Sequence, residues 1–208
     1  MAYIVTSPWW LRLAFSKHCV WEMPGDSKCV YLSFDDGPHP EITPFVLDTL
    51  KKYNAKATFF CIGKNVEKYP DVYQRILEEG HRVGNHTMSH MNSKKTEERI
   101  WLEDVKAASN WIDSDLFRPP YGRISRFQEK VLREAKPGYR IIMWTVLSGD
   151  FDQKLRGEEC FNIVKSKTKA GSIIVFHDSE KAWPRLKECL PETLENFENQ
   201  GFTFNAIT

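Results

Sequence analysis

The sequence predicts an α/β fold in which about seven parallel strands alternate with helices and close into a barrel. Short apolar or alternating segments follow one another with amphipathic helical segments between them, and neither a linker nor an internal repeat interrupts the series. Connections of this length favour right-handed crossovers between parallel strands. The length of 208 residues suits one domain with a substantial core.

Polar side chains also gather at one end of the expected strands. The residues at or just after the C-terminal strand ends are Asp35, Asp36, His86, Arg118, Asp150 and His177. In a β/α barrel those ends share one face, where active sites lie. An open doubly wound sheet would gather ligands in the same way, so this pattern supports a site more directly than it supports closure.

Hydrophobic periodicity gives the order of the elements. The expected strands cover residues 29–34, 57–62, 81–85, 116–118, 140–146, 172–176 and 202–206. The expected helices cover residues 41–53, 71–79, 96–113, 127–135 and 158–168, and a last helix precedes the final strand. The strand pattern is strongest at residues 140–146.

Individual residues indicate where these helices begin, end and face the core. Pro44 lies near the first turn of the first expected helix, and Gly80 follows the second one at a position typical of a C-terminal cap. Trp101 belongs to an apolar stripe that we expect to face the core. Pro191 is expected to begin the last helix, and Gly201 is expected to close it.

Residues 1–28 are expected to form an ordered lead-in packed on the same domain as residues 29–208. Trp9 and Trp10 begin an apolar run, but Arg12 interrupts it and no basic region precedes it, so we expect no signal peptide and a cytoplasmic protein. No stretch of the sequence approaches the roughly 20 apolar residues that a membrane span needs.

Charge and cysteine content exclude several function classes. The 29 basic and 28 acidic residues give a formal net charge of +1, so no affinity for nucleic acid follows from charge. We expect a monomer. The five cysteines are an odd number without a Cys-x-x-Cys pair, which favours reduced, buried thiols over a disulfide framework or a structural zinc site.

Two adjacent carboxylates, Asp35 and Asp36, follow the first expected strand. An Asp-Gly pair after a strand is most often a turn, but two neighbouring like charges repel unless a cation or hydrogen-bond donors stabilise them. His86 and His90 have the i, i+4 spacing by which one helical turn can present two imidazoles to one ion. A histidine pair alone is common, but two histidines and one carboxylate form a typical open catalytic metal site.

Four short motifs carry a resemblance to a known family. They are SFDDGP at residues 33–38, HTMSH at 86–90, RPPYG at 118–122 and VFHD at 175–178. With these four motifs in this order, the chain resembles the polysaccharide deacetylases of the NodB-homology family, carbohydrate esterase family 4. The resemblance runs from about residue 29 to the C-terminus. The resemblance implies a distorted β/α barrel and a metal-dependent removal of acetyl groups from N-acetylated sugars, as in chitin, chitooligosaccharides or peptidoglycan.

The resemblance also implies metal ligands and a base. Asp36, His86 and His90 would bind one divalent ion, with zinc as the first expectation and cobalt or nickel as alternatives for two nitrogen ligands and one oxygen ligand. Asp35 would stay uncoordinated and act as the general base for a water molecule that the metal activates.

Further roles follow from the same resemblance. Tyr121 would supply a backbone N–H to the tetrahedral oxyanion, and His177 would protonate the leaving amine. Asp150 would hold and charge-stabilise that imidazole, and Arg118 would keep Asp35 ionised. Taken singly, these residues also fit plain structural roles, namely a loop arginine at 118, a helix-capping pair at 177–178 and a turn residue at 150.

The chain departs from the family pattern beside the expected acid. Phe151 follows Asp150 where the family usually has tryptophan, and Val175 stands where leucine is usual. Either Phe151 or Trp144 would then form the hydrophobic wall for the acetyl methyl group.

Three functions fit these residues. The first is a deacetylase of N-acetylated glycans, and the second is a metal-dependent hydrolase of a small non-sugar amide, because one fold can host many activities. The third is a non-catalytic carbohydrate-binding protein with a vestigial site. The intact base, ligand triad, oxyanion donor and acid argue against the third function. Acetate release from N-acetylglucosamine oligomers, compared with release from small amides, would separate the first two.

Overall fold

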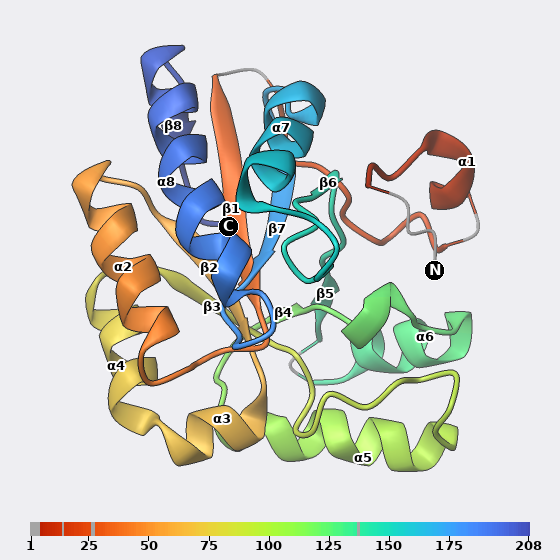
Figure 1. Cartoon of the computed structure of the whole chain (residues 1–208). Coiled ribbons are helices and arrows are strands. Elements are labelled where there is room, and N and C mark those ends of the chain that lie inside the picture. The colour runs from red at the N-terminus through yellow and green to blue at the C-terminus, as the bar shows by residue number, and fades with distance from the viewer. Residues whose placement is uncertain (1–4, 14, 26–27, 137) are drawn as a thin grey trace.

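Figure 1 shows the computed structural model, which describes residues 5–13, 15–25, 28–136 and 138–208. A curled parallel sheet forms its centre, with strand order β5-β4-β3-β2-β1-β7-β6 and with β8 paired to the start of β1. The strands are β1 (Cys29–Asp35), β2 (Ala57–Cys61), β3 (Arg82–Asn85), β4 (Leu116–Phe117), β5 (Arg140–Ile141), β6 (Val146–Leu147), β7 (Ile173–His177) and β8 (Thr203–Phe204). The predicted distorted β/α barrel is confirmed as a curled half-barrel.

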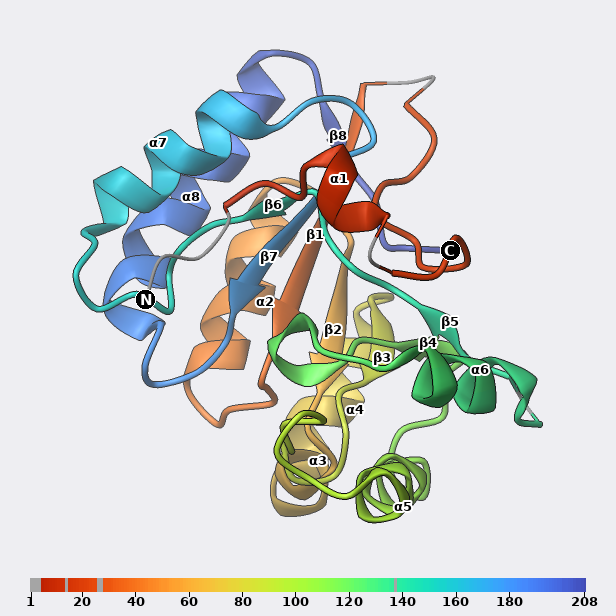
Figure 2. The same cartoon turned by 90° about the vertical axis from the view of Figure 1, so that its right-hand side faces the viewer.

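The 140–146 prediction is wrong in one respect, because this run is two short strands and not one. β5 pairs with β4 at one edge of the sheet, whereas β6 pairs with β7 at the other edge. The residues between them cross from edge to edge, as Figure 2 shows. Their backbone groups bond to several partners, since Met143 donates to Val20 at 2.7 Å and Thr145 donates to Ile173 at 2.9 Å. The strong apolar pattern therefore reflects burial of a segment that crosses between the two edges of the sheet.

The described part of residues 5–25 lies along this crossing segment. Ser7 donates its backbone N–H to the carbonyl of Thr145 at 3.1 Å, and Val20 donates to Ile141 at 2.8 Å. Glu22 forms an isolated antiparallel bridge with Ser172. A short helix, α1 (Trp9–Arg12), interrupts the segment.

Helices cover the outside of the sheet (Figures 1 and 2). They are α2 (Ile42–Lys52), α3 (Gly63–Lys68), α4 (Pro70–Glu78), α5 (Glu98–Ala108), α6 (Arg126–Glu134), α7 (Gly157–Lys167) and α8 (Trp183–Asn199), with a 3-10 turn η1 (Pro120–Gly122). The expected helices are found, although α5 ends five residues earlier than predicted. The short α3 and η1 were not predicted.

The start of the last helix was also predicted wrongly. Pro191 lies inside α8, which begins at Trp183 and has Pro184 in its first turn. An internal proline removes one helical hydrogen bond. Leu186 and Leu194, on either side of Pro191, are both fully buried, so packing of the apolar face offsets the loss.

Successive side chains of β1 point alternately to the hydrophobic core and to the inside of the half-barrel. Phe34 faces the helices and stacks between Phe59 and Phe176, with ring centroids 5.0 and 5.8 Å apart. Ser33 and Asp35 point to the opposite face, inside the half-barrel, as strand geometry requires.

All five cysteines are buried and free, as expected. Among the described residues, no helix combines the length and the apolarity that a membrane crossing needs.

Candidate active site

The register of the central strands places an acid opposite a histidine. Asp35 is the last residue of β1, and it pairs in register with His177, the last residue of β7. Asn85 ends β3 and pairs with Phe117, the last residue of β4, so His86 and Arg118 leave the sheet side by side. Parallel strands end at the same edge, and the sequence-predicted residues therefore meet there.

Arg118 is a fully buried cation that fixes the Asp35 carboxylate. Its Nη1 donates to Asp35 Oδ1 at 2.7 Å and to Ser33 Oγ at 2.8 Å. Its Nη2 donates to the carbonyl of Met143 at 2.9 Å, and the guanidinium carbon lies 4.0 Å from the centre of the Phe60 ring. Burial lowers the pKa of Arg118, and the Asp35 carboxylate opposes that effect. The predicted pairing of Arg118 with Asp35 is present in the structure.

His177 and Asp150 form the second predicted pair. The His177 Nδ1–H donates to Asp150 Oδ1 at 2.8 Å, and the His177 backbone N–H donates to Oδ2 at 2.7 Å. Asp150 is fully buried, and its carbonyl accepts from Arg185 Nε at 2.7 Å. Burial alone would lower the pKa of His177, but the charge and hydrogen bond of Asp150, followed by the charges of Asp36 and Asp35, raise it to about 9. The ring is therefore arranged to carry a proton near neutral pH.

Asp36, His86 and His90 form a compact cluster whose ligand atoms all lie within 4.8 Å of one another. His90 Nε2 lies 3.2 Å from Asp36 Oδ1, and His86 Nε2 lies 3.8 Å from the same oxygen. Neither contact has hydrogen-bond geometry, so this buried oxygen has no hydrogen-bond partner. A buried acceptor without a donor is the environment that a cation would satisfy.

The protonation of the cluster also fits a metal ion. His86 donates its Nδ1–H to the carbonyl of Arg118 at 2.7 Å, which leaves the Nε2 lone pair facing the cluster. Burial lowers the pKa of the His86 ring to about 4, so the ring is neutral at pH 7. Burial alone would raise the pKa of Asp36, but the proximity of His90 and the charges of His177 and His86 hold it below its ordinary value. One carboxylate and two imidazoles are the ligand set of an open catalytic site.

The backbone of this cluster corrects one sequence-based interpretation. His86 and His90 do not share a helical turn, because residues 86–90 form a loop after β3. Thr87 and His90 adopt left-handed conformations, with φ of 66° and 58°, which a helix does not allow. The two imidazole centroids nevertheless lie 5.0 Å apart.

Tyr121 lies beside the cluster in a third loop. Its ring is 4.7 Å from the His90 ring in an edge-to-face contact, and the side chain is 59% exposed. Its backbone is left-handed, with φ of 59°, and Gly122 follows with φ of 61°. A Cβ on Gly122 would lie 2.1 Å from Trp144 Cη2, so the turn packs directly on that indole. The role of the Tyr121 N–H as an oxyanion donor stays a prediction.

Sequence reasoning assigned Asp178, one residue past His177, no catalytic or metal-binding role. Its carboxyl group is buried and accepts from Thr43 Oγ1 at 2.5 Å. A Cβ on Gly37 would lie 2.1 Å from its Oδ2, so Asp178 packs beneath the residue that follows Asp36. Burial raises the pKa of Asp178 to about 8. Its position directly after the strand-end histidine could have marked it as a site residue in the sequence. Its contacts with Thr43 and Gly37 could not have been predicted from the sequence.

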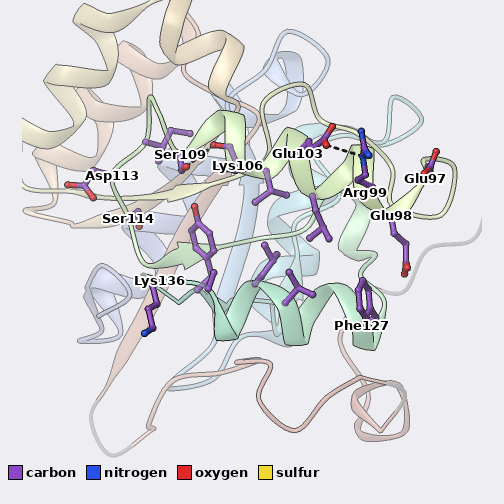
Figure 3. A pocket seen from close by; sticks show the side chains of 17 residues that line it. Glu97, Glu98, Arg99, Glu103, Lys106, Ser109, Asp113, Ser114, Phe127 and Lys136 are labelled. Carbon is purple, nitrogen blue, oxygen red and sulfur yellow. Dashed lines mark hydrogen bonds and ion pairs between the residues drawn. The ribbon is translucent and has the colours of Figure 1, made fainter.

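A large groove lies away from this cluster, between α5 and α6 on the outside of the sheet (Figure 3). It has a volume of about 980 Å³ and is lined by residues that include Leu102, Phe127, Val131 and Tyr139. None of the sequence-predicted site residues lines it. The sequence-predicted site residues therefore gather at the strand ends and not in this groove.

Fold and site together are those of a β/α-barrel hydrolase. The model of the polysaccharide deacetylase family matches residues 22–141. Together with the relatives below, this match shows that the chain belongs to the polysaccharide deacetylases of the NodB-homology family, carbohydrate esterase family 4.

Relatives and a solved structure support this membership along most of the chain. A peptidoglycan-N-acetylglucosamine deacetylase of Bacillus cereus is 34% identical over 197 residues, which cover 92% of each protein. A chitooligosaccharide deacetylase of Azorhizobium caulinodans is 33% identical and covers 72% of this chain and 73% of the relative. The crystal structure of the Bc1960 peptidoglycan N-acetylglucosamine deacetylase has a TM-score of 0.82 and 30% identity, over 96% of this chain and 94% of that one. Other relatives are longer, and the chain spans 38% of PgdA from Listeria monocytogenes.

Proposed function

We propose that this protein is a metal-dependent deacetylase that removes acetyl groups from N-acetylated amino sugars in oligosaccharides or polysaccharides of the peptidoglycan or chitooligosaccharide type. One observation carries the proposal, namely that two hydrogen-bonded pairs lie at the same strand ends as the cluster of Asp36, His86 and His90. In the first pair Arg118 holds the Asp35 carboxylate, and in the second Asp150 holds the His177 imidazole. A base, an acid and a candidate metal site are the parts that hydrolysis of an amide needs.

Asp36, His86 and His90 would hold the divalent ion, with zinc as the first candidate and cobalt or nickel as alternatives. When bound there, such an ion supplies Lewis-acid chemistry that makes water more acidic and polarises the acetyl carbonyl.

Asp35 and Tyr121 act on the first half of the reaction. Asp35 accepts a proton from the attacking water, and the hydrogen bond from Arg118 Nη1 holds its carboxylate in place for that step. The water oxygen forms a bond to the acetyl carbon, and the carbonyl oxygen gains negative charge. The backbone N–H of Tyr121 donates a hydrogen bond to that oxygen, which stabilises the tetrahedral intermediate.

His177 completes the reaction. Its Nδ1–H is held by Asp150, so the proton on Nε2 is the one that can be donated. The C–N bond breaks, the departing sugar nitrogen takes the Nε2 proton, and acetate and a free amine are formed. Phe151 lies edge-to-face with the His177 ring at 5.2 Å, which favours it over Trp144 as the hydrophobic wall for the acetyl methyl group.

The experiment that tests this function measures acetate released from N-acetylglucosamine oligomers of increasing length and from small N-acyl amides. Each substrate is assayed after chelation and after addition of zinc, cobalt or nickel, and metal content is measured by elemental analysis. We expect about one ion per chain, with metal-dependent release from the oligomers.

Two variants serve as a matched pair. His90→Ala should lose most of the metal and the activity, whereas His18→Ala, an exposed histidine far from the cluster in the sequence, should keep both. Release from small amides alone would support the amide hydrolase instead. Oligomer binding without acetate release by the metal-loaded protein would support the non-catalytic carbohydrate-binding function. Equal metal content in the parent protein and His90→Ala would contradict the ligand assignment.

A further inference from the structure

The loop that carries His90 has a backbone that its sequence does not favour. Thr87 and His90 both have positive φ, at 66° and 58°, and neither is glycine. Residues in the left-handed region persist only when surrounding contacts hold them there. The contacts of residues 87–90 therefore decide where the His90 ring lies.

Asp104 of α5 makes three of those contacts. Its Oδ2 accepts the backbone N–H of Ser89 at 3.0 Å, and its Oδ1 accepts the Ser89 hydroxyl at 2.7 Å. Its backbone carbonyl accepts the N–H of Met88 at 3.1 Å. The carboxylate is half-buried, and both of its oxygens are engaged with the residue directly before His90.

The other two members of the cluster are fixed in different ways. His86 is held through its own ring, by the bond from Nδ1–H to the Arg118 carbonyl. Asp36 follows β1, and its carbonyl accepts from Asn65 Nδ2 at 2.7 Å. His90 directly follows Ser89, so its place depends on the contacts that hold the backbone of the 86–90 loop.

We propose that Asp104 is a positioning residue for the metal ligand His90. The proposal rests on the proposed metal centre and adds a residue outside the four family motifs. Asp104 does not touch the ion. It holds Ser89, which holds the backbone of His90 in the conformation that directs the imidazole toward Asp36 and His86.

The expected effect is on metal affinity. Asp104→Ala leaves the Ser89 N–H and hydroxyl without their acceptors, so the loop relaxes and the His90 ring leaves its place. Partners that orient a metal ligand typically contribute about 10- to 100-fold in metal affinity, and we expect a loss in that range. Asp104→Asn keeps one acceptor oxygen, so its loss should be smaller but measurable.

Glu103 provides a matched control on the same helix. It is the neighbouring acid on α5, its side chain is 61% exposed, and it pairs with Arg99 at 3.1 Å. Its side chain lines the groove between α5 and α6 (Figure 3). Glu103→Ala removes the same charge from the same turn of helix without touching the 86–90 loop.

The test titrates zinc into the metal-free full-length chain in competition with a chromophoric chelator, for the parent protein, Asp104→Ala, Asp104→Asn and Glu103→Ala. Melting temperature without zinc and kcat at saturating zinc are measured on the same samples. We expect zinc affinity to fall in the order parent and Glu103→Ala, then Asp104→Asn, then Asp104→Ala, and excess zinc to restore most of kcat.

Contrary results are separable from failure of the proposed function. If the parent protein binds zinc and both Asp104 variants bind it equally well, the positioning role is wrong and the metal centre stands. A lower melting temperature with unchanged zinc affinity would likewise overturn it, since it would show a purely structural role. If the parent binds no divalent ion, the metal centre itself is wrong. Should Asp104→Ala fail to fold, the zinc affinity of Asp104→Asn decides.

Discussion

The charge of Asp150 should set the pH range in which the protein is active. In Asp150→Asn, one oxygen can still accept from the His177 Nδ1–H, but the negative charge is lost. In the proposed reaction the acid is the imidazolium form of His177, and Asp150 opposes the effect of burial on the pKa of that ring. The variant should therefore lose its acid form at a lower pH than the parent protein.

The structure gives the size of this effect. The pKa of His177 is raised from 6.5 to about 9, with Asp150 as the leading cause among the charges that raise it. If the variant returns to the ordinary value, the imidazolium fraction at pH 8 falls about 30-fold, whereas at pH 6 it falls less than about 2-fold. A bound cation lowers the pKa in both proteins, so both profiles begin from a lower value and the difference between them remains.

The assay is kcat/KM for acetate release from about pH 5 to pH 10 in the parent protein and Asp150→Asn. Asp152→Asn, two residues along the same loop, is the control for a general loss of negative charge. We expect the alkaline limb to move to lower pH in Asp150→Asn only. A uniform loss of rate with an unmoved limb would refute the reasoning, because Asp150 would then orient His177 or the loop without tuning its proton.

Two further predictions concern the proposed base, Asp35, and the turn that carries the proposed oxyanion donor, Tyr121. Asp35→Asn should keep most of its zinc while kcat falls by roughly two to four orders of magnitude, the usual contribution of a general base, and elemental analysis beside kinetics checks this. Parallel loss of zinc would make Asp35 a ligand. Gly122→Ala places a Cβ at 2.1 Å from Trp144 in a left-handed turn and should lower kcat by up to about 100-fold through displacement of Tyr121, with zinc affinity unchanged. Gly201→Ala, at φ of 77° with open space around it, carries the same backbone strain without the collision and should keep the parent kcat.

Much of the fold was predictable because strand and helix periodicity are local properties. The alternation of residues 29–34 indicated β1, and the apolar stripe of Trp101 indicated the buried face of α5. The pairing of residues 140–147 was not predictable, because it depends on two sheet edges that are far apart in the sequence. Pro191 inside α8 is a similar case, since packing of the apolar face outweighs a local helix-breaking preference.

The site was predictable to the extent that it consists of strand ends. Asp35 and Arg118 come within 2.7 Å, and His177 and Asp150 within 2.8 Å, because parallel strands end at the same edge. Asp104 could not be found in the same way. Its partners are a backbone N–H and a hydroxyl fifteen residues earlier, and neither has a sequence pattern.

The spacing of His86 and His90 shows how a correct pairing can follow from an incorrect backbone. In a helix, residues at i and i+4 lie about 5–6 Å apart between their Cβ atoms, which brings two imidazoles to one ion. Here the ring centroids are 5.0 Å apart, but the loop brings the two rings together through left-handed backbone at Thr87 and His90. A helix would have held the pair through its own hydrogen bonds, whereas this loop is held by bonds to α3 and α5. The affinity of the metal site should therefore respond to substitutions on α5 that touch no ligand.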